Sequence, residues 1–532
     1  MPTLDWIGKD KVINHHNDVP YKVLERKYSF DESGMHKEDI HSNNMIIHGD
    51  NLEALKSLLP QYEGKIKCIY IDPPYNTGNE GWIYNDNVND PKIKKWLGEV
   101  VGKEGEDLSR HDKWLCMMYP RLVLLQKLLA DDGAIFISID DNEHANLLLV
   151  CNEVFGSNNF IQDIIWNKRV SPARDAKFFS TDHEYILVYS KNKESLTTHF
   201  LPRTEKNNSY YKNPDNDPRG PWNSAAYTCN KSRDERPNLY YPITNPYTGE
   251  KIFPKESAVW AYSEETYQQH VRDNLLYWGV NGEAKQPRKK AFLSEVGDVV
   301  PRSVWSHSDV GSTQKATMEN NTIFNMRAFS YPKVSTLVER IIQIASDKDS
   351  IVLDSFAGSG TTAHAVLNMN KSDGGNRKFI LVEMGDYADT ITAERVKRVI
   401  NGYGEGKNAV EGTGGNFSYY ELGNPLFMQD GTINDEVDIT EVRKYVWYTE
   451  TNGIEYKEDI QEKYFLGSYN DTAYYFYYEK DKATILDYSF LATVNVKNQS
   501  YIIYADSCAL SDIDLQKWNI TFKKIPRDIE HI

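Results

Sequence analysis

The sequence predicts an α/β protein whose main domain is a parallel β-sheet covered by helices. Short, mostly apolar runs occupy residues 66–71, 134–139 and 378–382, and such runs are typical of strands buried on both faces. Residues 52–59 and 113–129 instead carry apolar side chains at helical spacing. Because strand and helix patterns alternate along the chain, a layered α/β fold is favoured.

The size and composition limit the class of protein. The 532 residues predict two to four domains. The five cysteines are scattered without a Cys-x-x-Cys spacing, which argues against a zinc site and a disulfide framework and fits a reducing compartment. The polar opening from Met1 to Asp5 and the short apolar runs predict neither a signal peptide nor a membrane span. We therefore expect a cytoplasmic protein with no bound metal and no membrane partner.

The charge of the chain is uneven. The formal net charge is -16, whereas nucleic-acid-binding proteins usually carry a basic surface. From Glu421 to the end there are 20 acidic and 11 basic residues, while basic residues lead between Lys285 and Lys290. Since a binding surface is local and the net charge is a sum, an acidic chain can still bind nucleic acid through its middle.

The N-terminal part is predicted to be an arm, residues 1–44, that packs on the core. A short strand follows at residues 45–48 and ends in Gly49 and Asp50. Asp50 precedes the helical run at Leu52, so it can be a helix cap. It can equally be a carboxylate that accepts a hydrogen bond from a nucleoside cofactor, and the sequence leaves both roles open.

The strand at residues 66–71 ends in Asp72-Pro73-Pro74-Tyr75. The prolines cannot donate to a β-ladder and they fix φ, so the strand stops there. A carboxylate, stiff carbonyl groups and an aromatic ring are thereby held at the carboxyl end of a strand, which is where open α/β sheets bind ligands. The alternative is a strand that simply ends in a Pro-Pro turn.

A long polar loop is predicted from Asn76 to about Ser109, with Trp82, Tyr84 and Trp96 in it. Loops of this length are usually functional or disordered, so we interpret it as a lid or a DNA-contacting loop.

The amino-acid composition changes between residues 191 and 321, where Pro, Asn, Tyr, Trp and basic residues replace the long apolar runs. Such a segment can be an irregular insertion that decorates the core. It can also be a module whose polar and aromatic side chains read base edges in a groove. Composition leaves both interpretations open.

The α/β pattern returns at residues 322–405 with a candidate nucleoside site. A strand ending in Asp354 runs into Phe356-Ala357-Gly358-Ser359-Gly360-Thr361, a Gly-x-Gly-x-x-Ala loop between a strand and a helix. The next strand ends in Glu383, within reach of ribose hydroxyls. No lysine follows Gly360, so the loop is not a P-loop, and a nucleoside without phosphates is the better fit.

Beyond residue 405 the sequence shows no recognisable set of catalytic residues. Residues 402–415 are rich in glycine and predict a linker. Residues 416–532 alternate aromatic and polar side chains and predict a small α+β domain. Its surplus of acidic residues favours contact with protein over contact with DNA.

Two motifs in this order resemble a known family. Asp72-Pro73-Pro74-Tyr75 resembles the catalytic motif of adenine amino-methyltransferases, and the loop from Phe356 to Gly360 resembles their S-adenosylmethionine loop. The catalytic motif comes first and a long segment separates the two, as in the β class of DNA methyltransferases. Asp50 and Glu383 match the acidic positions that contact the cofactor's adenosine in that family.

The resemblance implies a Rossmann-like S-adenosylmethionine-dependent fold with permuted motif order. The catalytic half would be residues 45–190, the inserted target-recognition domain 191–321 and the cofactor-binding half 322–405. The family often has Pro-Lys-Pro before the cofactor loop; here it is Pro332-Lys333-Val334, so Lys333 is a further candidate cofactor contact. Asp354 and Thr361 complete the candidate cofactor-binding residues.

The opening segment and the C-terminal extension resemble the modification subunit of type III restriction-modification systems. That resemblance implies double-stranded DNA as substrate, a homodimer and a restriction-subunit partner. In the implied mechanism Asp72 and the Pro73 carbonyl accept hydrogen bonds from the N6 amine of a flipped adenine, which stacks on Tyr75, and the amine takes a methyl group from S-adenosylmethionine. The alternatives are a solitary DNA methyltransferase, a catalytically silent DNA-specificity subunit, and an enzyme acting on RNA or protein amides.

Overall fold

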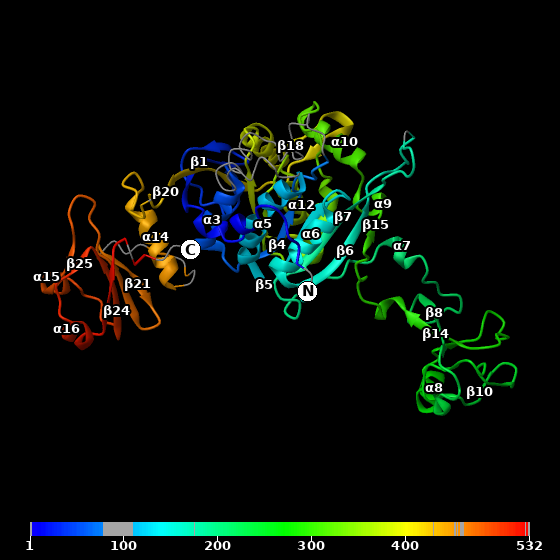
Figure 1. Cartoon of the computed structure of the whole chain (residues 1–532). Helices are drawn as coiled ribbons and strands as arrows, with labels where there is room; N and C mark the ends of the chain where they lie inside the picture. Colours follow the sequence, from blue (N-terminus) through cyan, green and yellow to red (C-terminus); the bar gives the residue numbers. More distant parts are fainter. Residues whose placement is uncertain are drawn as a thin grey trace. The chain divides into compact units, whose positions relative to one another are not determined.

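A computed structural model describes residues 3–77, 110–174, 176–428, 430–451, 454, 456–457, 462–526 and 528–529. Most of the predicted loop from Asn76 to Ser109, including Trp82, Tyr84 and Trp96, lies outside these residues. By internal contacts the chain divides into two compact units, Met1–His199 with Arg302–Ile532, and Phe200–Pro301. Figure 1 shows the whole chain.

The larger unit is built on one mixed sheet, which in the described part of the chain has eleven strands. From edge to edge these are β15 (Val304–Trp305), β6 (Phe160–Asn167), β7 (His183–Ser190), β5 (Leu129–Ile139), β4 (Ile66–Ile71), β16 (Ile351–Asp354), β17 (Lys378–Glu383), β3 (Met45–His48), β20 (Asn416–Pro425), β1 (Lys22–Asp31) and β2 (Gly34–His36). The predicted α/β fold is confirmed, and the predicted strands form its centre.

The two candidate motifs meet in the middle of this sheet. The run β5-β4-β16-β17-β3 is parallel throughout, and Ile69 of β4 pairs with Leu353 of β16. Because parallel strands end at the same edge, Asp72 and Asp354 follow neighbouring strand tips. From β4 the chain continues to its neighbour β5 on one side, and from β16 it continues to its neighbour β17 on the other side. The junction between β4 and β16 is therefore a topological switch point.

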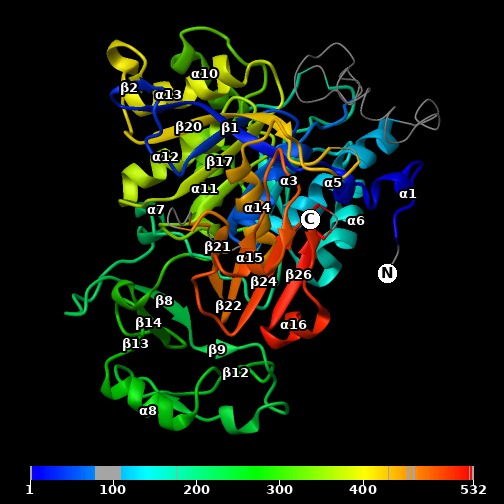
Figure 2. The ribbon, with the colours of Figure 1, turned by 90° about the vertical axis from the view of Figure 1, so that its left-hand side faces the viewer.

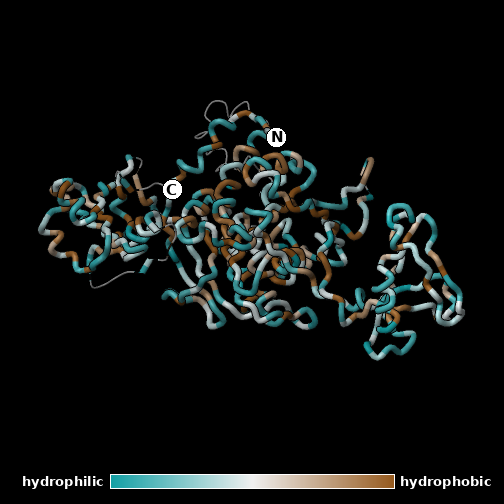
Figure 3. Tube along the Cα trace, turned by 90° about the horizontal axis from the view of Figure 1, so that it is seen from below, coloured by the Kyte–Doolittle hydropathy of each residue, from teal (hydrophilic) through white to brown (hydrophobic). Residues whose placement is uncertain are grey.

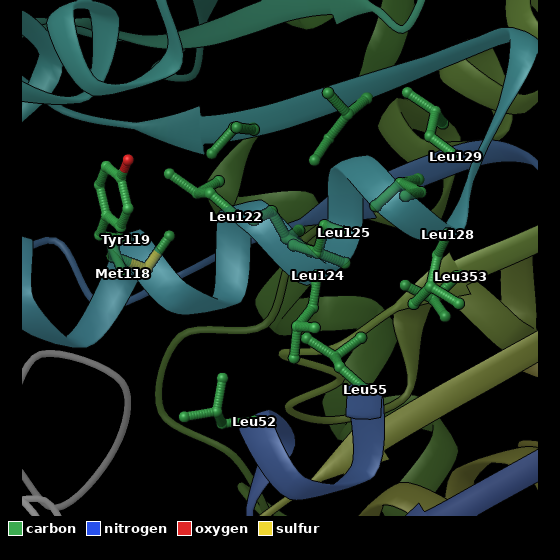
Figure 4. Packing of buried hydrophobic residues seen from close by; sticks show 14 of the residues in the cluster. Leu52, Leu55, Met118, Tyr119, Leu122, Leu124, Leu125, Leu128, Leu129 and Leu353 are labelled. Atoms are coloured by element: carbon green, nitrogen blue, oxygen red, sulfur yellow. The ribbon is translucent and has the colours of Figure 1, made fainter. Parts of the chain in front are cut away.

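Helices α3 (Asn51–Tyr62) and α5 (Arg110–Leu128) pack together on one face of the sheet. Figure 4 shows Leu55 of α3 next to Leu124 of α5, with Leu353 of β16 between the levels of Leu128 and Leu55, and all four belong to one buried apolar cluster. Side chains alternate along a strand, so the neighbours of Leu353 point to the other face, where α11 (Ser335–Ala345) and α12 (Thr361–Asp373) pack against β4 and β17. Further helices are α6 (His144–Cys151), α10 (Thr313–Phe324) and α13 (Glu394–Asn401).

The predicted N-terminal arm does more than pack on the core. After two short helices, α1 (Lys9–Val12) and α2 (His15–Asp18), it adds β1 and β2 to the main sheet. Trp6, Val12 and Val19 are buried in the same apolar cluster as α3 and α5.

The smaller unit is narrower than the predicted segment 191–321. It holds a three-stranded sheet of β8 (Trp222–Ala226), β14 (Arg288–Phe292) and β13 (Leu276–Tyr277), two small two-stranded antiparallel sheets, and the helix α8 (Glu264–Arg272). Its own core gathers tyrosine and tryptophan side chains around Ile243 and Trp260. Residues 302–321 belong instead to the larger unit, where β15 pairs with β6.

The C-terminal region also begins later than predicted. Residues 416–425 form β20, which pairs with both β3 and β1 in the main sheet. A separate four-stranded sheet follows, made of β21 (Phe465–Tyr469), β22 (Thr472–Phe476), β24 (Ser500–Ala505) and β26 (Ile520–Lys524), with α14 (Ile439–Thr451) against it. Figure 2 shows these strands side by side. The predicted linker 402–415 contains a small hairpin of β18 (Gly402–Tyr403) and β19 (Val410–Glu411).

In Figure 3 hydrophobic (brown) and hydrophilic (teal) segments alternate along the chain, and brown is frequent in the middle of the larger unit. Among the described helices, none has the length and apolar character that crossing a membrane requires.

Candidate functional site

The tip of β4 presents Asp72, whose side chain is 15% exposed. The two prolines after it are buried, and the indole Nε1 of Trp114 donates to the Pro74 carbonyl at 2.6 Å. Beyond Tyr75, the side-chain amide of Asn76 donates to the buried carboxylate of Glu143. The motif is therefore fixed from both sides, by α5 and by the residue that precedes α6.

Lys333 lies against this motif. Its ammonium donates to both carboxylate oxygens of Asp72, at 2.7 and 2.8 Å, and to the hydroxyl of Tyr75 at 2.8 Å. It also lies 4.8 Å from the centre of the Tyr75 ring. Lys333, which the resemblance made a cofactor contact, therefore touches two residues of the candidate catalytic motif.

Glu184, near the start of β7, is a site residue that the sequence analysis missed. It accepts hydrogen bonds from the Tyr75 hydroxyl at 3.0 Å and from Lys168 at 2.8 Å, and lies 3.6 Å from the Lys333 ammonium. The local signal was weak, a carboxylate that directly precedes the mostly apolar run 185–189.

The charges at this tip are interdependent. Burial raises the pKa of Asp72, and the nearby Lys333 only partly opposes that effect. Burial alone would lower the pKa of Lys333, but the carboxylates of Asp72 and Glu184 outweigh it and raise that pKa. Burial would likewise raise the pKa of Glu184, but Lys333 and Lys168 outweigh it and lower that pKa. The geometry is that of one ammonium shared by two carboxylates.

The tip of β16 holds a second buried carboxylate. Asp354 accepts hydrogen bonds from the backbone N–H of Phe356 at 3.0 Å and from the hydroxyl of Thr362 at 2.5 Å. Burial raises its pKa to about 7, although both hydrogen bonds favour the charged form. The neighbouring hydroxyl of Ser355 is buried and has no hydrogen-bond partner among the described residues.

The glycine loop connects β16 to α12 through left-handed backbone. Gly358 and Gly360 have φ of 51° and 81°, and a Cβ at Gly360 would lie 2.9 Å from the Thr392 carbonyl oxygen. The hydroxyl of Thr392 donates to the Gly358 carbonyl at 2.6 Å. Glycine is therefore required at position 360 by both conformation and space.

Glu383, at the tip of β17, holds this loop in place. Its two carboxylate oxygens accept from the backbone N–H groups of Gly358 at 2.7 Å and Gly385 at 2.8 Å. Burial raises the pKa of Glu383, although these hydrogen bonds favour the charged form. Each carboxylate oxygen has two lone pairs, so each can accept more than one hydrogen bond.

Two other candidate residues have structural partners. Asp50 is the N-cap of α3 and accepts from the backbone N–H of Leu52 at 2.8 Å, while Arg121 lies 3.4 Å from its other oxygen. The helix-cap role is thus present in the structure. Thr361 donates to the Lys333 carbonyl at 3.2 Å and accepts from Arg395, a buried arginine that the sequence analysis did not single out.

A small cavity lies between the tips of β4 and β16. It is lined by Tyr70, Asp72, Phe329, Tyr331, Pro332, Lys333, Asp354, Phe356, Ala357, Gly358, Ser359, Thr361 and Thr362. Six of the sequence-predicted site residues thus share one cavity, whereas the others, including Asp50, Gly360 and Glu383, are outside its lining. Four aromatic rings and two carboxylates form much of the wall, and Lys333 is the basic residue in it.

Comparison with known proteins identifies one family. The model of a family described as DNA methylase matches residues 66–394, more than half of the chain. The type III restriction-modification enzyme StyLTI Mod subunit of Salmonella typhimurium is 34% identical over 424 residues, 74% of this chain and 62% of that protein. The type II methyltransferase M.KpnI of Klebsiella pneumoniae is 33% identical over 361 residues, 64% of this chain and 81% of that protein.

The chain thus spans less than two thirds of the length of the StyLTI Mod subunit. Among solved structures, PvuII DNA methyltransferase (cytosine-N4-specific) matches with a TM-score of 0.35 and 14% identity, over 66% of this chain and 86% of that chain.

Proposed function

The chain belongs to the DNA methylase family, and on that premise we propose that it is a site-specific DNA methyltransferase that methylates the N6 amine of adenine with S-adenosylmethionine. One observation carries the proposal: the Asp72 carboxylate and the glycine loop after Asp354 line a single cavity at the switch point of the sheet. An amine acceptor and a nucleoside-binding loop are thereby adjacent, as methyl transfer between two bound substrates requires.

The residues around the cavity fit S-adenosylmethionine. Glu383 lies against the glycine loop, where its carboxylate can also accept from ribose hydroxyls, and the buried Ser355 hydroxyl lacks a partner among the described residues. Phe329 and Phe356 offer aromatic walls for a purine. The described wall of the cavity has two acidic side chains, Asp72 and Asp354, and one lysine, Lys333. This balance of charge suits a cationic nucleoside better than a phosphorylated one. When bound there, the cofactor would supply a methyl group on a positively charged sulfur.

The chain's own residues then act on the amine. An exocyclic amine is a poor nucleophile because its lone pair is delocalised into the base. Hydrogen bonds from that amine to Asp72 and the Pro73 carbonyl favour a localised lone pair, and the prolines and Trp114 hold these acceptors still. Tyr75 provides a face on which an extruded base can stack. The surplus proton leaves after transfer, so Asp72 need not be a strong base.

Adenine is proposed because residues 72–75 resemble the motif of adenine amino-methyltransferases, although the amine of cytosine poses the same chemical problem. The test is to express the protein in cells that lack their own DNA methylation and to hydrolyse the DNA to nucleosides. We expect N6-methyldeoxyadenosine, and none from cells that express Asp72→Ala. N4-methyldeoxycytidine would contradict the base, and unmodified DNA in both cultures would contradict the enzyme.

We also propose that the protein works in a restriction-modification system, as a homodimer and with a restriction subunit as partner. The similarity to the StyLTI Mod subunit supports this, and the acidic C-terminal region supplies a surface unsuited to DNA. Because β20 belongs to the main sheet, truncation should begin after Phe427 and leave 416–425 in place. Loss of the dimer or of a co-expressed restriction subunit from this truncated protein would support the proposal. Loss of DNA affinity with the assembly intact would contradict it.

A further inference from the structure

The loop between β6 and β7, residues 168–182, leaves the sheet at the same edge as Asp72. Ile71 of β4 pairs in parallel with Ile137 of β5, and Ile139 of β5 pairs in the antiparallel sense with Tyr185 of β7. The start of β7 therefore lies level with the carboxyl end of β4. The hydrogen bond from Tyr75 to Glu184, two residues after the loop, confirms this placement.

Two adjacent phenylalanine side chains in this loop are exposed to solvent. Phe178 is 82% exposed and Phe179 is 92% exposed, the highest value among the large hydrophobic side chains of the described residues. Single exposed apolar residues are common, but two neighbouring aromatic rings that are almost fully exposed are a poor arrangement for a surface that meets only water.

The base of the loop is held in place. The Lys168 N–H donates to the Asp182 carbonyl at 2.9 Å, which closes the loop where it leaves the sheet. The hydroxyl of Ser180 accepts from the Ala173 N–H at 2.7 Å and donates to the Asp182 carboxylate. The teal segment that projects beyond β6 and β7 in Figure 1 is this loop. Its base is fixed while its phenylalanines extend outward.

The loop that carries the two rings is basic in sequence, since Lys168, Arg169, Arg174 and Lys177 outnumber Asp175 and Asp182. Arg169, Arg174 and Lys177 are exposed, and the Lys177 ammonium lies 5.3 Å from the centre of the Phe178 ring. On a chain with a net charge of -16, this is a local basic surface with an apolar tip. Apolar wedges flanked by Arg and Lys are the means by which proteins open a base step while holding the phosphates.

We propose that residues 168–182 form a wedge loop that inserts Phe178 and Phe179 into the duplex beside the base that is extruded. The inference rests on the proposed function, because the wedge is proposed to act beside a base that the enzyme extrudes. Extruding a base leaves a gap in the stack, and an aromatic ring in that gap replaces part of the lost stacking. Arg169, Arg174 and Lys177 contact the flanking phosphates.

The test compares the double variant Phe178→Ala/Phe179→Ala with wild type and with Ile513→Ala. Ile513 is 77% exposed and lies in the C-terminal region, so it is a matched control for removing an exposed apolar side chain. The probe is a duplex with the modified site found in host DNA and 2-aminopurine at the target base. A second duplex is identical except that the 2-aminopurine is mismatched and so already easy to extrude.

On the paired duplex we expect the double variant to bind roughly tenfold or more weakly than wild type. Its change in 2-aminopurine emission should be smaller by a similar factor. On the mismatched duplex it should stay within about threefold of wild type, because the mismatch already supplies part of the extrusion energy. Arg174→Ala/Lys177→Ala should instead weaken binding to both duplexes alike. It should also reduce the salt dependence of binding, by about one in log–log slope for each phosphate that the variant no longer neutralises.

If the phenylalanine variant loses the same affinity for both duplexes, the loop contacts DNA without entering the stack. If it loses affinity for neither, the loop does not bind DNA. Either result overturns the wedge. These readouts require no methyl transfer. Wild-type protein that extrudes the base without methylating it would therefore contradict the proposed function alone. Wild-type protein that binds neither duplex would overturn both proposals.

Discussion

Lys333 donates to both carboxylate oxygens of Asp72, at 2.7 and 2.8 Å, and so contacts the group that we propose as acceptor for the substrate amine. The ammonium has a second acidic neighbour in Glu184, 3.6 Å away. Each carboxylate oxygen of Asp72 has a second lone pair, so the proposed substrate amine can bind beside the ammonium or displace one of its hydrogen bonds. In either case Glu184 offers the charge that keeps the ammonium near. The pair links the segment before α11 to the catalytic motif.

The first prediction concerns Lys333→Met. Burial raises the pKa of Asp72 and the Lys333 ammonium opposes this, so removing the ammonium should raise that pKa further. If the ionised carboxylate is the acceptor for the amine, the variant will reach half of its maximal single-turnover rate at a higher pH than wild type. Lys333→Arg keeps the charge and is the matched control, with a profile near that of wild type. An unchanged midpoint in Lys333→Met would show that the pair does not set the ionisation of Asp72.

The second prediction concerns Asp72→Ala. The contact from the amine to Asp72 matters most in the transition state, so its removal should appear in turnover more than in binding. Removal of a preorganised hydrogen-bonding group costs on the order of a hundred- to a thousandfold in rate. Affinity for S-adenosylmethionine, measured by calorimetry, should hold because Gly358 lies in the loop after β16 and Glu383 at the tip of β17. Near-normal turnover would exclude Asp72 from the chemistry.

The third prediction concerns the stability of Asp354→Asn. Burial raises the pKa of Asp354 to about 7, above the unfolded value of 3.8. The protonated form is thus favoured by folding, and the stability it contributes falls as pH rises from about 4 through 7. Asparagine does not ionise and keeps the size of the side chain. The free energy of unfolding of the variant, relative to that of wild type, should therefore rise by roughly 2–3 kcal/mol between pH 5 and pH 7 and change little beyond pH 8.

The measurement is denaturant unfolding of both proteins across this pH range without cofactor. The difference between variant and wild type cancels the titration of all other groups. A difference that is flat with pH, or that falls as pH rises, would show that Asp354 is ionised in the folded protein at neutral pH.

The fourth prediction concerns the smaller unit. If Phe200–Pro301 reads the DNA sequence, replacing it with the corresponding unit of a relative should move methylation to the relative's site. The structure gives better boundaries than the predicted 191–321: Leu201 pairs with Val299 at the base of the unit, while β15 at 304–305 belongs to the main sheet. Sequencing of modified bases gives the result. Methylation at the original site after the exchange would assign recognition to another part of the chain.

The sequence alone predicted the centre of this fold because its signals are local. An apolar run that ends in Asp72-Pro73-Pro74 specifies both a buried strand and where it stops, and the family inferred from that motif and the glycine loop is confirmed by the family match. The strand that ends in Glu383 was placed for the same reason. These residues need no distant partner to be recognised.

What the sequence could not give depends on contacts between distant residues. Glu184 is one carboxylate among many until β7 is seen to bring it against Tyr75, 109 positions earlier in the chain. Residues 416–425 looked like part of a separate domain because nothing local shows that they pair with β1 and β3. Arg395 is likewise ordinary in the sequence, yet its side chain is buried against Thr361.

The last prediction separates the ring of Tyr75 from its hydroxyl. The ring is the proposed stacking face, while the hydroxyl donates to Glu184 and accepts from Lys333. Tyr75→Ala removes both and should lose most methylation and most of the 2-aminopurine emission change. Tyr75→Phe keeps the ring and loses both hydrogen bonds. A loss of transition-state stabilisation equal to one such bond, about 0.5–1.5 kcal/mol, lowers turnover by roughly two- to tenfold, and the emission change should persist. Glu184→Gln keeps a side chain that can accept from the Tyr75 hydroxyl and is the control for that contact. Equal losses in the Phe and Ala variants would assign the role of Tyr75 to its hydroxyl and reject stacking.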